Sequence, residues 1–140
     1  MPRNPMAPND AKVIELNPQA QARRRVLVVD DNLDTVHTTA MLIRSMGHEV
    51  QFAINGFAAL DVARSFRPDV ILRDIMLPDF DGPDIARQLK YEPGLEKTRV
   101  VAITGRRLDE VRDRAMDAGC ESVLAKPLSI AQLEDLLAEQ

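Results

Sequence analysis

The 140-residue sequence predicts an α/β fold, a three-layer doubly wound sandwich in which helices cover both faces of a five-stranded parallel sheet. Two observations predict it. Short apolar runs typical of strands alternate five times with segments whose apolar residues recur every three or four positions, as in helices. The connections between these segments are short, and this alternation requires parallel strands joined by crossover helices.

The first strand–helix unit begins with RVLVVD at 25–30, a continuous apolar run ending in an acid, as expected of a strand buried on both faces. Gly47 is expected to end the helix that follows. The predicted buried face of that helix consists of Leu33, Val36, Ala40 and Ile43.

The second unit begins with HEVQFA at 48–53, which is shorter and more polar and therefore suits an edge strand. A helix is predicted after Asn55–Gly56, and Pro68 closes the connection to the next strand. Its inward residues are expected to be Ala59, Val62 and Phe66.

The last three units are predicted in the same way. DVILRD at 69–74 is the third strand, and FDGPD at 80–84 is a loop leading into a helix that reaches about Tyr91. RVVAIT at 99–104 and SVLAK at 122–126 are the fourth and fifth strands.

The helix between these two strands carries an apolar stripe of Leu108, Val111, Ala115 and Ala118. Ser129 and Gln132 form a capping box that opens the last helix. The inward residues of that helix are expected to be Ile130, Leu133 and Leu137.

Composition limits the class of protein. A single cysteine, Cys120, precludes an intrachain disulfide and fits a reducing compartment. No apolar run approaches the roughly 20 residues of a membrane span, and the N-terminus lacks the apolar core of a signal peptide. We therefore expect a cytoplasmic protein with no membrane partner.

Charge divides the chain into a basic tail and an acidic body. Residues 1–25 hold five basic and two acidic side chains, which leaves 13 basic and 20 acidic side chains for the remainder. An acidic body argues against direct binding of nucleic acid. Residues 1–23 are proline-rich with little apolar periodicity, so we expect a flexible tail there and a single domain over 24–140.

Four of the five predicted strands end on chemically reactive residues. These are Asp30 (with Asp31 next), Asp74, Thr104 and Lys126. Because the carboxyl ends of parallel strands meet at one edge of a sheet, where ligands bind, we expect these side chains to converge.

Three carboxylates at one edge repel one another, since two unit charges about 4 Å apart cost about 4 kcal/mol at an effective dielectric near 20. Lys126 supplies one positive charge, which is too little alone. A divalent cation such as Mg²⁺, which prefers oxygen ligands, is the natural addition. The set of three acids, a cation, a hydroxyl and a lysine suits phosphoryl transfer with one carboxylate as the nucleophile.

The blocks VLVVDDN, DVILRDIMLPDFDG, VVAITG and LAKP resemble, in order and spacing, those of the response-regulator receiver domain of two-component signalling. The resemblance covers residues 25 to about 139. It implies the flavodoxin-like strand order 2-1-3-4-5, which the handedness and length of the connections alone do not determine.

The resemblance also implies roles for individual residues. Asp74 matches the phosphoacceptor, whereas Thr104 and Lys126 match the hydroxyl and the ammonium that bind the phosphoryl group. Asp30, Asp31 and Asp74, with the backbone carbonyl of Met76, match the ligands of Mg²⁺ (or Mn²⁺). The Lys126–Pro127 bond is expected to be cis.

The family further implies a phosphodonor, either a histidine kinase or a histidine phosphotransfer protein, and a downstream protein partner. In the family the fourth helix, fifth strand and fifth helix often form a partner or homodimer surface. The mixed charges of residues 106–114 suit either a solvated helix face or such a surface. We expect a stand-alone receiver that catalyses only its own phosphorylation and dephosphorylation.

Two departures from the family pattern keep a second interpretation open, a pseudo-receiver that binds partners without phosphorylation. Val123 stands where an aromatic residue often rotates on activation, and Arg73 stands where a small or apolar residue is common. An aspartate-nucleophile phosphohydrolase is less favoured, because such enzymes need an acid two residues after the nucleophile and Met76 stands there. A flavodoxin-like cofactor carrier is disfavoured because DDNLD after the first strand would repel phosphate.

Arg73 itself raises a question, since burying a charge is costly unless it is paired. Side chains alternate along a strand, so Arg73 and Asp74 are predicted to point to opposite faces of the sheet. We expect the stem of Arg73 to pack under a helix and its guanidinium to reach a carboxylate or solvent.

Overall fold

In a computed structural model, the described residues are 23–74, 87–89, 91–105, 108–117 and 119–138. Several predicted features lie outside them. These are the tail up to residue 22, the loop at 80–84, the carbonyl of Met76, Ala118, and, in the helix expected to reach Tyr91, the residues before 87 and residue 90. The described residues 87–89 are helical.

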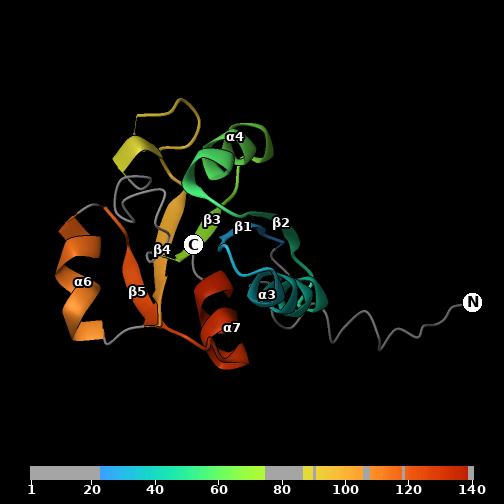
Figure 1. Ribbon diagram of the computed structural model, residues 1–140. Coiled ribbons are helices and arrows are strands. Elements are labelled where there is room, and N and C mark those ends of the chain that lie inside the picture. The colour runs from blue at the N-terminus through green and yellow to red at the C-terminus, as the bar shows by residue number, and fades with distance from the viewer. Residues whose placement is uncertain (1–22, 75–86, 90, 106–107, 118, 139–140) are drawn as a thin grey trace, which may run out of the picture.

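The elements alternate between strand and helix as predicted (Figure 1). In chain order they are β1 (Arg25–Val29), α3 (Leu33–Ser45), β2 (Glu49–Ala53), α4 (Gly56–Phe66), β3 (Val70–Asp74), β4 (Arg99–Thr104), α6 (Leu108–Asp117), β5 (Ser122–Ala125) and α7 (Ile130–Ala138). Within the described part of the chain, no helix is both long and apolar enough to cross a membrane.

The five strands form one parallel sheet in the order β2-β1-β3-β4-β5. The α/β fold class and the strand order implied by the resemblance are therefore confirmed. The polar strand β2 lies at one edge of the sheet, as its composition predicted, and β5 lies at the other. β1 and β3 are neighbours near the centre of the sheet. Asp30 and Asp31 directly follow β1, and Asp74 is the last residue of β3.

Each face of the sheet has its own hydrophobic core. α3 and α7 cover one face, where Val36 and Leu133 pack against strand residues such as Val28 and Leu72. α4 and α6 cover the other face, where Ala59 and Ala115 pack against residues such as Leu27 and Ile71. All five residues of β3 are buried, which shows that both sides of the strand are covered and explains its apolar start at Val70–Leu72.

Two residues predicted to be buried are exposed. The predictions for Leu33 and Ile130 were wrong, since these side chains are 52% and 54% exposed. Both are the first residue of a helix that starts at the carboxyl edge of the sheet, so the first turn extends beyond the strands that would cover it. The predicted burial of Val36, Ala40 and Ile43 is confirmed.

Side-chain caps fix where three helices begin. Asn32 accepts a hydrogen bond from the Thr35 N–H at 3.2 Å, and Asn55 accepts one from the Ala58 N–H at 2.8 Å. The capping box of Ser129 and Gln132 is confirmed, with reciprocal hydrogen bonds of 2.9 and 3.0 Å. These caps place the first turns of α3 and α7 beside the carboxyl ends of the strands.

Candidate functional site

Three acids meet at the carboxyl edge of the sheet. Asp30 and Asp31 directly follow β1, and Asp74 is the last residue of the neighbouring strand β3. One carboxylate oxygen from each of the three lies within 4.8 Å of the other two. Asp30 and Asp74 are 3% and 7% exposed, whereas Asp31 is exposed. The convergence predicted from the strand ends is therefore observed for all three acids.

Local hydrogen bonds hold the two acids after β1 in place. The Asp30 N–H donates to the Ala53 carbonyl at 3.1 Å, which continues the pairing of β1 with β2 by one residue. The Asn32 N–H donates to the Asp30 carboxylate at 2.9 Å. Because Asn32 also caps α3, the turn that carries Asp31 is tied at one end to the sheet and at the other to the helix.

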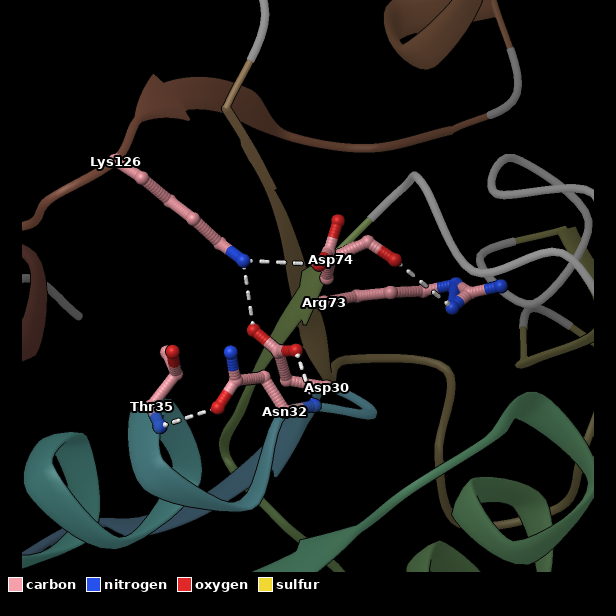
Figure 2. A network of polar contacts seen from close by, with 6 residues as sticks. All are labelled: Asp30, Asn32, Thr35, Arg73, Asp74 and Lys126. Atoms are coloured by element: carbon pink, nitrogen blue, oxygen red, sulfur yellow. Dashed lines mark hydrogen bonds and ion pairs between the residues drawn. The ribbon is translucent and has the colours of Figure 1, made fainter.

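Lys126 joins the acids from the end of β5. Its Nζ lies 2.8 Å from Oδ2 of Asp30 and 2.9 Å from Oδ2 of Asp74. Figure 2 shows its extended side chain reaching both carboxylates from the opposite side of the site. One ammonium thus neutralises part of the negative charge that the three acids concentrate here, as the sequence predicted.

The environment of Lys126 keeps it charged. Burial alone would lower the pKa of its ammonium, but the hydrogen bonds to Asp30 and Asp74, and the charges of those groups, together outweigh it and raise the pKa. At neutral pH the side chain of Lys126 is therefore a protonated ammonium, which cannot accept a proton as a general base. Its chemistry at this site is charge neutralisation.

The geometry of the acids fits a divalent cation. Opposite ligands of Mg²⁺ are about 4.2 Å apart, since each lies about 2.1 Å from the ion, and one oxygen from each acid lies within 4.8 Å of the others. Three negative charges and a single ammonium leave a net negative site, which attracts such an ion. The residues present therefore could hold a metal ion. The carbonyl of Met76, predicted as a further ligand, lies outside the described residues.

Thr104 is connected to the site through the main chain. It ends β4, is fully buried, and its carbonyl accepts a hydrogen bond from the Lys126 N–H at 2.8 Å. The strand partner of Asp74 is Ile103, the residue just before Thr104. The Lys126–Pro127 bond is cis, as the resemblance implied.

Arg73 differs from its prediction in one respect. Its strand partners Val29 and Ala102 belong to the core under α4 and α6, so its side chain lies on that face, away from the carboxylate of Asp74. The expectation that the two side chains point to opposite faces agrees with Figure 2. The suggestion that the guanidinium reaches solvent is wrong, because Arg73 is 0% exposed. An extended run of apolar neighbours gave no signal that a guanidinium could be accommodated there.

Known proteins resemble this chain in sequence and in architecture. Residues 26–138 match the family model described as the response regulator receiver domain. The chain is 36% identical over 107 residues to the polar-differentiation response regulator DivK of Brucella anthropi, a match that covers 76% of this chain and 87% of that protein.

Solved structures agree with the sequence comparison. The receiver domain of the sensor histidine kinase PA1611 from Pseudomonas aeruginosa, whose structure has a magnesium ion coordinated in the active-site cleft, superposes with a TM-score of 0.74 at 30% identity and covers 83% of this chain and 95% of that chain. The chemotaxis protein CheY4 of Vibrio cholerae superposes with a TM-score of 0.76 at 26% identity and covers 83% and 97%. With the family model spanning both cores and every element of the sheet, the chain belongs to the response regulator receiver domain family.

Proposed function

We propose that this receiver accepts a phosphoryl group on Asp74 from a phosphohistidine donor in a metal-dependent reaction and thereby switches its interactions with other proteins. The observation that carries the proposal is the position of the Asp74 carboxylate. It ends a central strand, 2.9 Å from a fixed ammonium and beside two further acids that could hold a cation. Membership of the receiver family supports the same assignment.

The transfer itself is a displacement at phosphorus. A carboxylate oxygen of Asp74 forms the new O–P bond while the P–N bond of the donor breaks, and the electron pair of that bond returns to the imidazole nitrogen. The ionised state of Asp74 is the reactive one, and the neighbouring ammonium of Lys126 stabilises it. The same ammonium can bind a phosphoryl oxygen as charge develops there.

Asp30, Asp31 and Asp74, with the Met76 carbonyl, are the proposed ligands of Mg²⁺ or Mn²⁺. When bound, the ion neutralises charge on the transferring phosphoryl group. Thr104 is proposed to donate its hydroxyl to a phosphoryl oxygen, because its strand end lies next to that of Asp74. No general base is required, since a carboxylate nucleophile has no proton to lose.

The proposed partners follow from this chemistry. The donor is a histidine kinase or a histidine phosphotransfer protein, and the recipient of the signal is a protein whose affinity changes when Asp74 is modified. A homodimer through α6, β5 and α7 is part of the proposal, as are a cytoplasmic location and a domain that begins at residue 24. We further propose that the chain turns over no external substrate beyond its own phosphorylation and dephosphorylation.

The test is labelling by a small phosphodonor. The purified chain is incubated with acetyl phosphate and Mg²⁺, and the phosphorylated fraction is measured by intact mass. Labelling is expected for the wild type, and is expected to be lost in Asp74→Asn or when EDTA removes the metal. Asp69→Asn is the matched control, because Asp69 lies next to the other end of β3, where it accepts a hydrogen bond from the Arg25 N–H at 2.9 Å. Undiminished labelling of Asp74→Asn would refute the assignment.

A further inference from the structure

Arg73 is the largest of the fully buried side chains in the described part of the chain, and it directly precedes the proposed nucleophile. A guanidinium keeps its charge in proteins, so it cannot escape the cost of burial by losing a proton. That cost is large unless hydrogen bonds and nearby charges compensate it. The three preceding residues of β3 (Val70–Leu72) are apolar and incur no such cost. A specific interaction therefore has to offset the burial of Arg73.

The side chain of Arg73 lies on the face of the sheet opposite to the acids. Its neighbours across the sheet are Val29 on β1 and Ala102 on β4, and the small side chain of Ala102 leaves room for a long neighbour. Its charge also acts within this core. Burial raises the pKa of the Cys120 thiol, and the positive charge of Arg73 partly opposes that effect. The side chain of Arg73 is thus fully buried on the face of the sheet that α4 and α6 cover.

The guanidinium turns back toward the main chain of Asp74. Its Nη1 lies 3.5 Å from the Asp74 carbonyl oxygen, a long contact strengthened by the charge of the donor. On the other side of the strand the Asp74 carboxylate receives the Lys126 ammonium at 2.9 Å. Figure 2 shows Lys126 and Arg73 approaching Asp74 from opposite sides. Asp74 is therefore held at two points, its side chain by one cation and its main chain by another.

We infer that Arg73 is a positioning residue for the phosphorylation of Asp74, an inference that rests on the proposed function. It fixes the last peptide group of β3 from behind the sheet, and this fixes the direction from which the carboxylate attacks. In-line attack requires the reacting atoms to be about 3–3.5 Å apart, and a displacement of about 1 Å can slow a reaction about 100-fold. Among the described residues, Arg73 donates to the main-chain carbonyl of Asp74, so its proposed role is to position Asp74 through that peptide group.

The test compares Arg73→Met and Arg73→Lys with the wild type. Methionine has a similar length without charge or donor, whereas lysine restores both in a different shape. With acetyl phosphate as donor, Arg73→Met is expected to lower the maximal phosphorylation rate by about 10- to 100-fold while leaving the half-saturating donor concentration unchanged. Arg73→Lys is expected to recover part of that rate. The ¹³C chemical shift of the Asp74 carbonyl is expected to move in Arg73→Met and to return partway in Arg73→Lys.

Arg99→Met is the matched control. Arg99 is a half-buried strand arginine that donates to a main-chain carbonyl, that of Leu136, at 3.0 Å, but at the opposite edge of the sheet. The variant Arg99→Met is expected to lower the free energy of unfolding without changing the phosphorylation rate. Arg73→Met phosphorylated at the wild-type rate, with an unchanged Asp74 carbonyl shift, would overturn the inference.

Two outcomes separate this inference from the proposed function. If the wild type itself is not labelled at Asp74, the proposed function fails; if the wild type is labelled and Arg73→Met is equally fast, only the role of Arg73 fails. Should Arg73→Met not fold, Arg73→Lys decides alone. Its ammonium cannot reproduce the planar fork of a guanidinium, so the rate is expected to fall several-fold, and a wild-type rate overturns the inference.

Discussion

The ammonium of Lys126 lies 2.9 Å from the carboxylate of Asp74, although 52 residues separate the two in the sequence. The same ammonium lies 2.8 Å from Asp30, so one charge connects the carboxyl ends of β1, β3 and β5. A bound metal ion would share these carboxylates with Lys126. The ammonium and the metal are therefore partners in neutralising the acids and rivals for the same oxygen atoms, which makes their effects separable by experiment.

Replacing Lys126 is expected to strengthen metal binding while weakening phosphorylation. In Lys126→Met the Mg²⁺ dissociation constant should fall by about tenfold, because a unit charge about 6 Å away is worth roughly 3 kcal/mol at an effective dielectric near 20 and solvent screens about half of it. The phosphorylation rate should fall, because the ammonium no longer stabilises charge on the phosphoryl group. Mg²⁺ titration and acetyl phosphate labelling measure the two effects, with the exposed Lys97→Met as control. Weaker Mg²⁺ binding in Lys126→Met would contradict the charge argument.

The acidic cluster should make stability depend on the metal. Mg²⁺ at about 100 times its dissociation constant is expected to stabilise the wild type by about 2.7 kcal/mol, as for any ligand that binds only the folded state. Asp31→Asn should lose most of this gain, yet in EDTA it should unfold at a higher temperature than the wild type because one repelling charge is gone. Thermal unfolding with Mg²⁺ and with EDTA tests both. Asp61→Asn on α4 is the control, since its side chain is 83% exposed and lies outside the cluster. Equal Mg²⁺ stabilisation of the wild type and Asp31→Asn would remove Asp31 from the site.

Much of this site could be predicted from the sequence because strand ends in a parallel sheet share one edge. The apolar runs located β1, β3, β4 and β5, and the polar residues that end or follow them predicted the convergence of Asp30, Asp74 and Lys126. The order of the strands came only from the family resemblance, since short crossover connections are compatible with several orders.

The rest depended on packing that the sequence does not encode locally. Leu33 and Ile130 fit the apolar periodicity of their helices, but periodicity says nothing about where the sheet beneath ends. Alternation along β3 placed Arg73 opposite to Asp74, whereas its complete burial depends on the small Ala102 beside it on β4. The sequence of β3 alone does not show that Ala102 is the neighbour of Arg73 across the sheet.

His48 should make stability depend on pH at the opposite edge of the sheet. Burial lowers its pKa, as do the charges of Arg24 and Arg23, and its Nδ1 accepts a hydrogen bond from the Arg24 N–H at 2.9 Å, which requires an unprotonated nitrogen. The unfolded chain binds a proton below about pH 6.5, whereas the folded protein resists it until a lower pH. The contribution of His48 is therefore complete above about pH 6.5 and is lost as the pH falls through that value toward the folded pKa.

His48→Asn keeps an acceptor for the Arg24 N–H and removes the titration. Denaturant unfolding between pH 5 and 7 should show a shallower loss of stability in this variant, by at most about 1.4 kcal/mol per pH unit for one proton. His37→Asn, at an exposed position on α3, is the matched control. The same pH dependence in His48→Asn and the wild type would show that the wild-type slope has another origin.

Thr104 offers the sharpest test of how the phosphoryl group is held. Its side chain is fully buried, its carbonyl accepts from the Lys126 N–H at 2.8 Å, and its strand end lies beside that of Asp74. Thr104→Val preserves shape but removes the hydroxyl, so the phosphorylation rate should fall by about tenfold or more, as when one preorganised donor is lost. Thr104→Ser keeps the hydroxyl and should retain most of the rate.

Thr98→Val is the matched control, because it removes a hydroxyl that donates to the Pro68 carbonyl at 2.8 Å at the other edge of the sheet. It should lower the free energy of unfolding by about 1 kcal/mol with no change in labelling. If Thr104→Val is labelled by acetyl phosphate as fast as Thr98→Val and keeps its phosphoryl group as long, the hydroxyl serves the core of the sheet, and the phosphoryl group is held by Lys126 and the metal alone.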